Sequence, residues 1–410
     1  MLLLELLSIL ALVSIGAPLA YLYLLAIASI RVRRIKPHPV ADGARLRFAI
    51  TIPAHNEEGV IEQSVAALKK LDYPAHLFDV HVVADYCTDQ TAEMARRAGA
   101  IVHERQEGLR GSKGAAMRWL FERLLSDEGC AAYGAVDGIV VFDADTVVSP
   151  GFIRLMDQRL REGAPVVQGQ HRISNPDDGW FPALMAAMFI VDNRFQNLGR
   201  SNLGWSAKNM GDSICYRADV LKQVAWTEGL TEDYEFRQRL LLGGMRIVYE
   251  PGAIGYGEAA ANWTVARAQR ARWLAGTYQS SHRFAGQMLR EGLRRLDLKL
   301  LDGAAQSFFP SYSTLTLISA AILVLNVALL SWISPVFAYI WTAVVILLGI
   351  YPLVGLGLER APVKTFIAMS LGPLFIIWRT VLSLMARFGR PVEWVRTARR
   401  GTVHGDGTAK

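Results

Sequence analysis

The chain has 410 residues, enough for a large folded domain together with several membrane-spanning helices. Its formal net charge of +7 is modest and no segment matches a nucleic-acid-binding motif, so we expect no nucleic-acid partner. The three cysteines have no paired spacing, which argues against a disulfide framework and against a structural zinc site.

Residues 1–30 form an apolar segment whose single charged residue is Glu5. The segment is long enough to cross a bilayer. A secretory signal peptide carries its basic residues before the apolar core, whereas the basic residues here follow it, at positions 31–36. We therefore predict an uncleaved transmembrane helix with a basic flank over residues 1–36, and we expect the chain after it to lie in the cytosol.

Residues 46–275 alternate apolar runs with helical patterns, which is typical of an α/β domain. Strands are predicted at 47–53, where Pro53 stops the run, and at 78–84, 101–103 and 138–142. Helical patterns are predicted at 57–71, 91–98 and 113–125. This alternation predicts a parallel sheet covered on both faces, and such a sheet binds ligands beyond the carboxyl ends of its strands.

Residues 180–200 have apolar side chains at helical spacing, which fits either a core helix or a helix at the membrane interface. Residues 276–310 are expected to form an interfacial amphipathic segment. The apolar character of both segments therefore leaves open how much of the chain touches the bilayer.

The transmembrane region is expected at 311–390, followed by a basic cytosolic tail at 391–410. Within the region, the spans predicted from apolar length are 315–333 and 336–358. A third stretch at 364–388 contains Gly372-Pro373 and Arg379, and a fourth crossing would place the basic tail outside the cell. We therefore predict three spanning helices and one re-entrant or interfacial segment, in a multi-pass protein of the inner (plasma) membrane.

Carboxylates follow two of the predicted strands. Asp143-Ala144-Asp145 comes after the strand at 138–142, where carboxylates two residues apart can face one bound ion and its phosphates. Hard oxygen ligands of this kind suit magnesium or manganese, although a solvated turn explains the triplet equally well on its own. Asp85 ends the strand at 78–84, where its carboxylate can accept a hydrogen bond from a nucleobase or ribose.

Two further motifs precede helical patterns. Gly111-Ser112-Lys113-Gly114 offers backbone amides and the Lys113 ammonium to an anionic ligand, but a plain loop-to-helix junction is at least as good an explanation. Thr231-Glu232-Asp233 begins a helical run. Capping of this helix is enough to explain Thr231 when the residue is considered in isolation. Asp233 is the better candidate for a base, because an acceptor beside a metal-bound diphosphate needs a carboxylate outside the metal pair.

Gln269-Arg270-Ala271-Arg272-Trp273 lies on a helical pattern ahead of a basic segment at 290–299. Arginine can hold phosphates through two hydrogen bonds, and tryptophan can stack on a sugar ring. Anchoring at the membrane surface is the alternative explanation of this cluster. In chain order, the motifs predict a site for a metal-bound nucleotide diphosphate, with a base for an acceptor.

Together these motifs resemble the family 2 glycosyltransferases of the GT-A fold, over about residues 46–275. Ile52-Pro53-Ala54-His55-Asn56-Glu57-Glu58 is similar to the opening strand and loop of that family. Asp143 and Asp145 match its DxD motif, and Asp233 matches the base of its TED motif. The motif at 269–273 matches the Q-x-x-R-W signature of membrane-embedded, often processive synthases of cellulose, chitin, hyaluronan and poly-N-acetylglucosamine.

The resemblance implies a Rossmann-like mixed α/β sheet of GT-A type in a cytosolic domain, with N- and C-terminal transmembrane helices. It also implies an inverting hexosyltransferase that moves a sugar from a nucleotide sugar, expected to be UDP-linked, to a growing polysaccharide. Asp233 would be the catalytic base, and Asp145 would bind the magnesium or manganese ion. The implied donor-binding residues are Pro53, His55, Glu57, Asp85, Lys113, Asp143, Ala144, Asp145 and Arg272. The implied acceptor-binding residues are Glu232, Gln269, Arg270 and Trp273.

The chain departs from the family pattern in two places. Ala84 stands before Asp85, where two acidic residues are usual, and the segment Gly211-Asp212-Ser213-Ile214-Cys215 differs from the usual acceptor-site sequence. The second departure leaves the identity of the acceptor open. Few predicted spans are available for a polymer channel, so secretion of a polymer would require an export partner or a homo-oligomer.

Three other functions remain compatible with parts of the sequence. A non-processive transferase would add one sugar to a lipid-linked acceptor. A non-catalytic subunit of an export assembly would not need the intact set of carboxylates. A nucleotidyltransferase could use a similar α/β scaffold but would not need Trp273.

Overall fold

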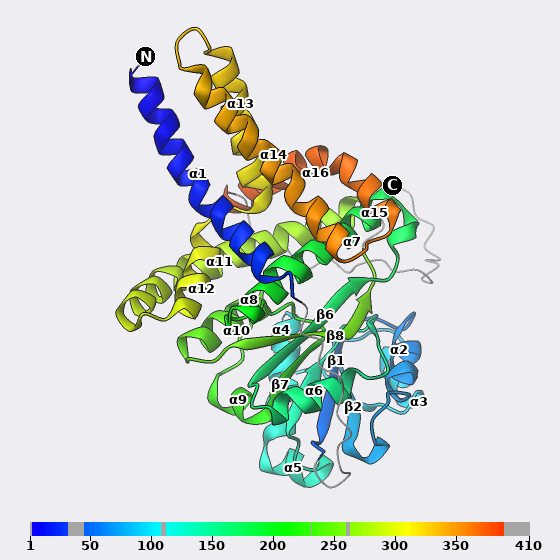
Figure 1. Ribbon diagram of the computed structural model, residues 1–410. Coiled ribbons are helices and arrows are strands. Elements are labelled where there is room, and N and C mark those ends of the chain that lie inside the picture. The colour runs from blue at the N-terminus through cyan, green and yellow to red at the C-terminus, as the bar shows by residue number, and fades with distance from the viewer. Residues whose placement is uncertain (1, 32–44, 108–111, 230, 260–262, 389–410) are drawn as a thin grey trace. The chain divides into compact units, whose positions relative to one another are not determined.

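The computed structural model describes residues 2–31, 45–107, 112–229, 231–259 and 263–388 (Figure 1). The chain divides into two compact units. The helical unit comprises the described residues within Met1–Arg33, Pro176–Ala207 and Ser281–Pro391, and the sheet unit comprises those within Arg34–Asn175 and Lys208–Ser280. The sheet unit holds every motif predicted to carry chemistry.

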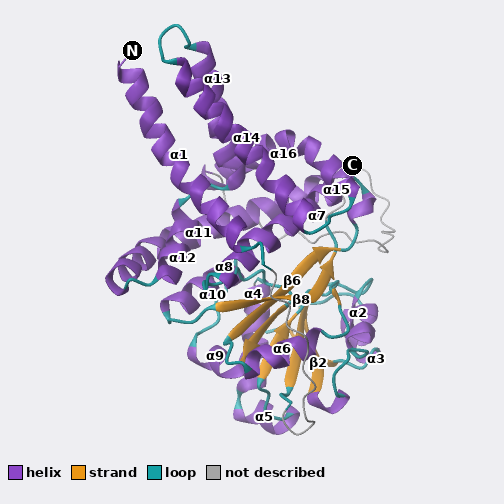
Figure 2. Cartoon of the chain, viewed as in Figure 1, coloured by secondary structure: helices purple, strands orange, loops and turns teal. Residues whose placement is uncertain are grey.

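The sheet unit is built on one mixed sheet, whose strand order is β3-β2-β1-β4-β7-β6-β8-β5 (Figure 2). Its strands are β1 (Phe48–Ala54), β2 (Phe78–Asp85), β3 (Ile101–Arg105), β4 (Gly138–Val141), β5 (Val147–Val148), β6 (Val166–Ile173), β7 (Ile214–Arg217) and β8 (Ile247–Gly257). The first four strands are parallel to one another, as predicted from their alternation with helices. β7 runs antiparallel to both β4 and β6, and β5 runs antiparallel to β8. The mixed sheet implied by the family resemblance is therefore confirmed. The entirely parallel sheet predicted from the alternation of strands and helices is not.

Helices cover both faces of this sheet. They are α2 (Ile61–Leu68), α3 (Thr91–Arg97), α4 (Lys113–Leu125), α5 (Asp127–Tyr133), α6 (Phe152–Arg161), α9 (Ala218–Gln223) and α10 (Glu232–Leu242). The sheet unit also contains the part of α11 (Trp263–Arg295) up to Ser280. Successive residues of a strand point to opposite faces. Accordingly, Val80 and Val82 of β2 join the core beneath α2 and α6, whereas His81 lies against Tyr133 of α5.

Most of the predicted elements of this unit are confirmed, with small differences at their ends. The strands expected at 78–84 and 138–142 and the helix at 113–125 match within one residue. The helix expected at 57–71 is shorter, because residues 58–60 form a turn and α2 begins at Ile61. Pro53 does not stop β1, which continues to Ala54. β3 extends two residues beyond the predicted 101–103, to Arg105.

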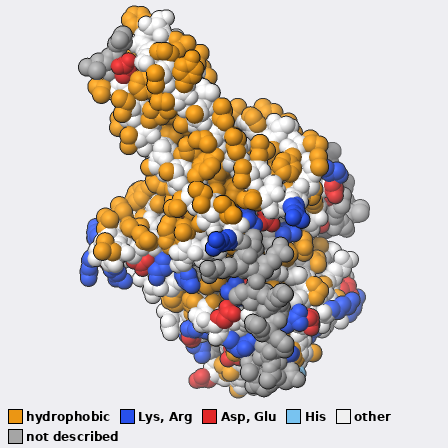
Figure 3. Space-filling view, viewed as in Figure 1, with side chains coloured by type: hydrophobic (Ala, Val, Ile, Leu, Met, Phe, Trp, Pro, Cys, Tyr) orange, Lys and Arg blue, Asp and Glu red, His pale blue; other side chains and the backbone are white. Residues whose placement is uncertain are grey.

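The helical unit contains α1 (Leu2–Ala28), α7 (Trp180–Val191), the π-helix η4 (Asp192–Leu198), α8 (Gly199–Asn202), α12 (Leu298–Phe308), α13 (Tyr312–Ala328), α14 (Pro335–Leu358), α15 (Val363–Ala368) and α16 (Gly372–Phe388). The helical prediction for 180–200 is confirmed, although its second half is a π-helix, which no spacing rule predicted. α1 packs against α13 and α14 through Ile15, Leu315 and Trp341. Figure 3 shows hydrophobic side chains dominating the surface of α1, α13 and α14.

A buried ion pair joins three helices of this unit. Arg200 of α8 donates from Nε to both carboxylate oxygens of Asp302 in α12, at 3.0 and 3.1 Å. It also donates to the Tyr21 hydroxyl in α1 at 2.6 Å, and Gln306 donates to Asp302 at 2.8 Å. Because every charge has a hydrogen-bonding partner, the pair can lie in an apolar interior without an unpaired ion.

Three described helices are long and apolar enough to cross a membrane, namely Leu3–Ala28, Pro335–Leu358 and Val363–Met385. α12 and α13 meet the same criterion only as one span bent by 58°. The span predicted at 315–333 falls on α13, which ends at Ala328, and it stays a prediction. The stretch at 364–388, predicted to be re-entrant or interfacial, has the length of a full span. The basic flank at 32–36 and the tail at 391–410 lie outside the described residues.

Candidate active site

The carboxyl ends of β1 and β2 meet at one edge of the sheet. His55, just after β1, lies with Nδ1 2.6 Å from the backbone oxygen of Asp85. Asn56 and Tyr86 follow the two strands with positive φ values of 55° and 50°. Non-glycine residues rarely adopt this conformation, and they concentrate where surrounding contacts hold a functional loop in place. The edge predicted to bind a nucleotide therefore carries two such residues side by side.

The Asp85 side chain is buried and forms an ion pair with Arg105 at the end of β3. Glu57 is buried as well, and its backbone amide donates to the Thr91 hydroxyl at 2.7 Å. Arg105 was not among the predicted site residues, because the strand that carries it was expected to end at residue 103. The predicted nucleotide-contacting residues His55 and Asp85 are thus brought together, with Arg105 as an additional cation beside them.

Lys113, the first residue of α4, forms an ion pair with Asp143. Its Nζ also donates to the backbone oxygen of Gly211 at 2.7 Å. Burial alone would lower the pKa of Lys113, but the charges of Asp143, Glu232 and Asp212 outweigh it and raise the pKa above its usual value. Lys113 is therefore a permanent cation in the centre of the site.

Asp143, Ala144 and Asp145 form a turn beyond β4, closed by a hydrogen bond from the Thr146 amide to the Asp143 carbonyl at 3.1 Å. Ala144 is buried, and its carbonyl accepts from the Ser64 hydroxyl at 2.6 Å. The Asp143 side chain is 42% exposed, so its carboxylate faces an accessible space as well as Lys113. The turn is anchored by its middle residue, and the Asp143 carboxylate on it is accessible.

Two residues that sequence reasoning did not assign complete this region. Asp212 lies just before β7, and its carboxylate accepts from the Asp143 amide at 3.0 Å. His171, near the end of β6, has Nδ1 2.7 Å from the same carboxylate. Burial would raise the pKa of Asp212, but His171, the Asp143 amide and Lys113 outweigh it and lower the pKa. Burial would lower the pKa of His171, but the hydrogen bond and charge of Asp212 raise it.

Asp233 lies in the first turn of α10 and accepts from the Tyr234 amide at 2.8 Å. It faces Gly211, where an added Cβ would lie 3.2 Å from Asp233 Oδ2. Burial raises the pKa of Asp233, and the charges of Lys113 and Arg272 partly offset the increase. Burial and the Asp233 charge together raise the pKa of Glu232. A carboxylate whose proton affinity is raised by its surroundings is suited to accept a proton.

The motif at 269–273 lies on α11, next to the start of α10. An added Cβ on Gly276 would lie 2.6 Å from Thr231 Oγ1, so the two helices approach closely only because position 276 is glycine. Arg272 is near enough for its charge to lower the pKa values of Glu232 and Asp233. The Arg270 guanidinium lies 5.8 Å from the centre of the Trp273 ring, which is 37% exposed. The structure thus brings the TED and Q-x-x-R-W motifs together.

Among the described residues, no group of three or more His, Cys, Asp or Glu side chains is arranged to hold a metal ion. Asp143 and Asp145 nevertheless offer two carboxylates on one turn. Magnesium commonly takes one or two carboxylates together with phosphate and water oxygens. This pair of residues therefore fits an ion that binds together with a diphosphate.

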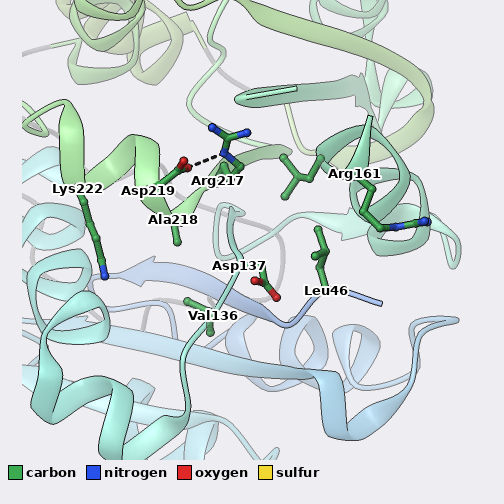
Figure 4. A pocket seen from close by; sticks show the side chains of 9 residues that line it. Leu46, Val136, Asp137, Arg161, Arg217, Ala218, Asp219 and Lys222 are labelled. Carbon is green, nitrogen blue, oxygen red and sulfur yellow. Dashed lines mark hydrogen bonds and ion pairs between the residues drawn. The ribbon is translucent and has the colours of Figure 1, made fainter. Parts of the chain in front are cut away.

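A separate pocket lies at the opposite edge of the sheet, at the amino ends of β1 and β4 (Figure 4). Asp137, Arg217 and Lys222 line it, and Arg217 pairs with Asp219 at 2.6 Å. None of the predicted site residues lies in it. The pocket therefore plays no part in the constellation described above.

Comparison with known proteins decides the family. Residues 45–276, more than half of the chain, match the family described as "Glycosyltransferase like family 2". The chain belongs to this family. It is therefore a family 2 glycosyltransferase that uses a nucleotide sugar, as the motifs implied.

Individual relatives share about a quarter of their residues with the chain over the aligned region. The chain is 25% identical over 339 residues to the probable glycosyltransferase YdaM of Bacillus subtilis, with 74% of each chain covered. It is 28% identical over 243 residues to a beta-monoglucosyldiacylglycerol synthase of Nostoc sp., which covers 56% of this chain and 49% of that protein. The chain therefore spans about half the length of the second relative.

A solved structure shares the fold. The mannosyltransferase PcManGT from Pyrobaculum calidifontis, in complex with GDP-Man and Mn2+, matches with a TM-score of 0.53 and 18% identity. The match covers 86% of this chain and 98% of that one. At this identity the likeness shows the fold, and it agrees with a GT-A-type α/β sheet flanked by hydrophobic helices.

Proposed function

We propose that this glycosyltransferase inverts the anomeric carbon of its donor, with Asp233 as the base. One observation carries the proposal. The Cα of Gly211 faces the Asp233 carboxylate, and the Gly211 carbonyl accepts a hydrogen bond from Lys113, which is paired with Asp143 of the DxD turn. A base and a diphosphate-binding turn are thus adjacent, as an in-line displacement requires.

The proposed reaction follows from this arrangement. Asp233 removes the proton of an acceptor hydroxyl as its oxygen attacks the anomeric carbon. The bond from that carbon to the diphosphate breaks on the opposite face, and its electron pair leaves with the diphosphate. Lys113 and Arg272 balance the charge that develops on the leaving group. Pro53, His55, Glu57, Asp85 and Ala144 form the rest of the donor site.

A divalent ion, magnesium or manganese, is proposed to bind Asp145 together with the diphosphate. When bound, it would neutralise the leaving group and hold the phosphates in one orientation. The chemistry of the two carboxylates supports this proposal, and the PcManGT structure, which shares the fold, contains Mn2+. The same structure contains GDP-Man, so the donor test includes GDP-sugars beside the expected UDP-sugars.

A growing polysaccharide is the proposed acceptor, supported by the resemblance of residues 269–273 to the signature of processive synthases. Glu232, Gln269, Arg270 and Trp273 would line its site. A second candidate is a single addition to a lipid or lipid-linked acceptor, favoured by the name of the Nostoc relative. Either acceptor fits a domain at 46–275 on the cytosolic side of the membrane, with the segment at 276–310 at its surface.

The test uses the purified full chain in lipid vesicles with Mn2+ and a panel of UDP- and GDP-sugars. Nucleotide release and product mass are read together, so a ladder of oligomers separates a processive enzyme from a single addition. Asp233→Asn should lower turnover about 10²–10⁴-fold, the usual contribution of a general base. Asp127→Asn, at an exposed carboxylate on α5, is the control and should retain full turnover. Full turnover by Asp233→Asn would exclude the base assignment.

A further inference from the structure

The dipeptide Gly211-Asp212 lies against several of the predicted site residues, namely Lys113, Asp143 and Asp233. Asp212 is 3% exposed, and both oxygens of its carboxylate accept hydrogen bonds from two groups each. In the sequence, the segment at 211–215 is notable only because it differs from the family pattern. The contacts of Asp212 indicate a specific role for this residue.

One oxygen of Asp212 holds the DxD turn from both sides. Oδ1 accepts from the Asp143 amide at 3.0 Å and from the Thr146 hydroxyl at 2.9 Å. These two residues flank Ala144 and Asp145 in the chain. The backbone that carries Asp145 is therefore held by hydrogen bonds made on either side of it.

The other oxygen is held by the sheet. Oδ2 accepts from the Ser213 hydroxyl at 2.9 Å and lies 2.7 Å from His171 Nδ1. Glycines on β8 make room for both partners. An added Cβ would lie 1.9 Å from Ser213 Oγ at Gly255, and 2.7 Å from His171 Cε1 at Gly257. The strand is thus shaped to accommodate this network.

The residue before Asp212 contacts the remaining parts of the site. The Gly211 carbonyl accepts from Lys113 at 2.7 Å, and its Cα faces the Asp233 carboxylate. Gly211 has a φ of +71°, a conformation that other residues adopt only with strain. Any displacement of Asp212 would therefore move both the donor turn and the wall beside the base.

We propose that Asp212 is a positioning residue that sets the DxD turn for the metal-bound diphosphate, and that His171 holds Asp212 in place. The proposal rests on the nucleotide-sugar reaction proposed above. It assigns to the departure at 211–215 a role in donor binding. A purely structural role for Asp212 would predict that loss of its carboxylate lowers stability without changing nucleotide affinity.

The experiment measures binding of UDP and of GDP to the purified full chain by calorimetry, with and without Mn2+. Groups that orient metal ligands typically change affinity 10–100-fold when removed. Asp212→Ala should therefore weaken binding of the preferred nucleotide diphosphate about 10–100-fold with Mn2+, and raise the KM for donor more than it lowers kcat. Asp212→Asn keeps an oxygen for the Asp143 amide and the Thr146 hydroxyl, so it should remain within a few-fold of the unaltered chain.

Asp157→Asn is the matched control. Asp157 is also a buried carboxylate, but it holds the Leu46 amide and Arg161 at the opposite edge of the sheet. This variant should lose stability yet bind nucleotide with unaltered affinity. A second pair of variants tests the proposal should Asp212→Ala fail to fold. His171→Asn retains a donor near the Nδ1 position and should bind nearly normally, whereas His171→Leu should weaken binding.

The outcomes separate this proposal from the function on which it rests. If the unaltered chain binds neither UDP nor GDP, the proposed nucleotide-sugar reaction fails and the role of Asp212 fails with it. If the unaltered chain binds one of them and folded Asp212→Ala or His171→Leu binds it equally well, the positioning role alone is wrong. Weaker binding by the folded variants, with normal binding by Asp157→Asn, supports it.

Discussion

At the scale of single residues, the charge state of Asp233 depends on opposing influences. Burial raises its pKa, while the Tyr234 amide, Lys113 and Arg272 lower it. The raised pKa means that the carboxylate takes up a proton at a higher pH than an ordinary aspartate. A protonated Asp233 cannot accept the proton of an acceptor hydroxyl, so activity should fall as the pH falls through this pKa.

Replacing Lys113 by methionine should therefore move the acidic limb of the activity profile to higher pH. The substitution removes a cation that favours the charged form of Asp233, and burial then acts with less opposition. The acidic limb is measured as the rate of nucleotide release at saturating donor over a series of pH values. Lys222→Met, at an exposed position on α9, should leave it in place. An unchanged limb in Lys113→Met would show that Asp233 does not control the profile.

The chemistry-bearing residues were predictable where they follow parallel strands. Asp85 is the last residue of β2 and Asp143 lies two residues beyond β4, so the rule that ligands bind at carboxyl ends found them. The rule did not find Asp212, because Asp212 precedes a strand. That strand, β7, is antiparallel to β4 and therefore begins at the edge where β4 ends. His171 escaped because it lies within β6, where a histidine is more simply explained by the core.

At the scale of elements, the sequence predicted the first four strands and α4 well, because long apolar runs and helical spacing are local signals. The positions of β5 to β8 depend on pairing between distant segments, which no local pattern encodes. The π-helix η4 and the close approach of α11 to Thr231 at Gly276 are likewise consequences of tertiary packing. The order of motifs was therefore readable from the chain, whereas their contacts were not.

A pair of buried histidines joins β2 and β3. His81 Nδ1 lies 3.1 Å from His103 Nε2, and the Tyr133 ring meets both imidazoles edge-on. Burial, reinforced by neighbouring positive charge, lowers the pKa of His81 to about 3 and that of His103 to about 4. Both histidines are therefore neutral in the folded chain at neutral pH.

This pair should make the sheet unit sensitive to acid. Below pH 6.5 the unfolded chain binds protons at these histidines and the folded chain does not, so stability is lost as the pH falls from about 6.5. At pH 5 the loss should be about 2 kcal/mol per histidine, or several degrees in Tm. Thermal unfolding of the purified chain between pH 7 and 5 measures it.

The double variant His81→Leu/His103→Leu should flatten this dependence, because it removes both titrating groups. His76→Gln, at an exposed histidine, should retain the acid sensitivity of the unaltered chain. An equal decrease in Tm for the double variant would place the sensitivity elsewhere in the molecule.

At the scale of the whole molecule, the interfacial segment proposed at 276–310 would add to membrane attachment by the candidate spanning helices. Three leucines are exposed where α11 ends and α12 begins, namely Leu293, Leu296 and Leu298, by 60%, 83% and 60%. Basic side chains flank the turn, at Arg290, Arg294, Arg295 and Lys299. Exposed leucines beside basic residues are the combination that binds the surface of an anionic bilayer. This pattern supports the interfacial segment proposed at 276–310.

Activity in vesicles should therefore increase with the fraction of anionic lipid and decrease with added salt, since each basic residue near such a surface contributes about 1 kcal/mol. Replacing Arg290, Arg294, Arg295 and Lys299 by glutamine should remove this dependence without abolishing activity in neutral vesicles. A matched control replaces Lys69, Lys70, Arg96 and Arg97, which are exposed on the sheet unit, by glutamine. That variant should respond to anionic lipid as the unaltered chain does. The same lipid dependence in both variants would mean that the spanning helices alone hold the enzyme at the bilayer.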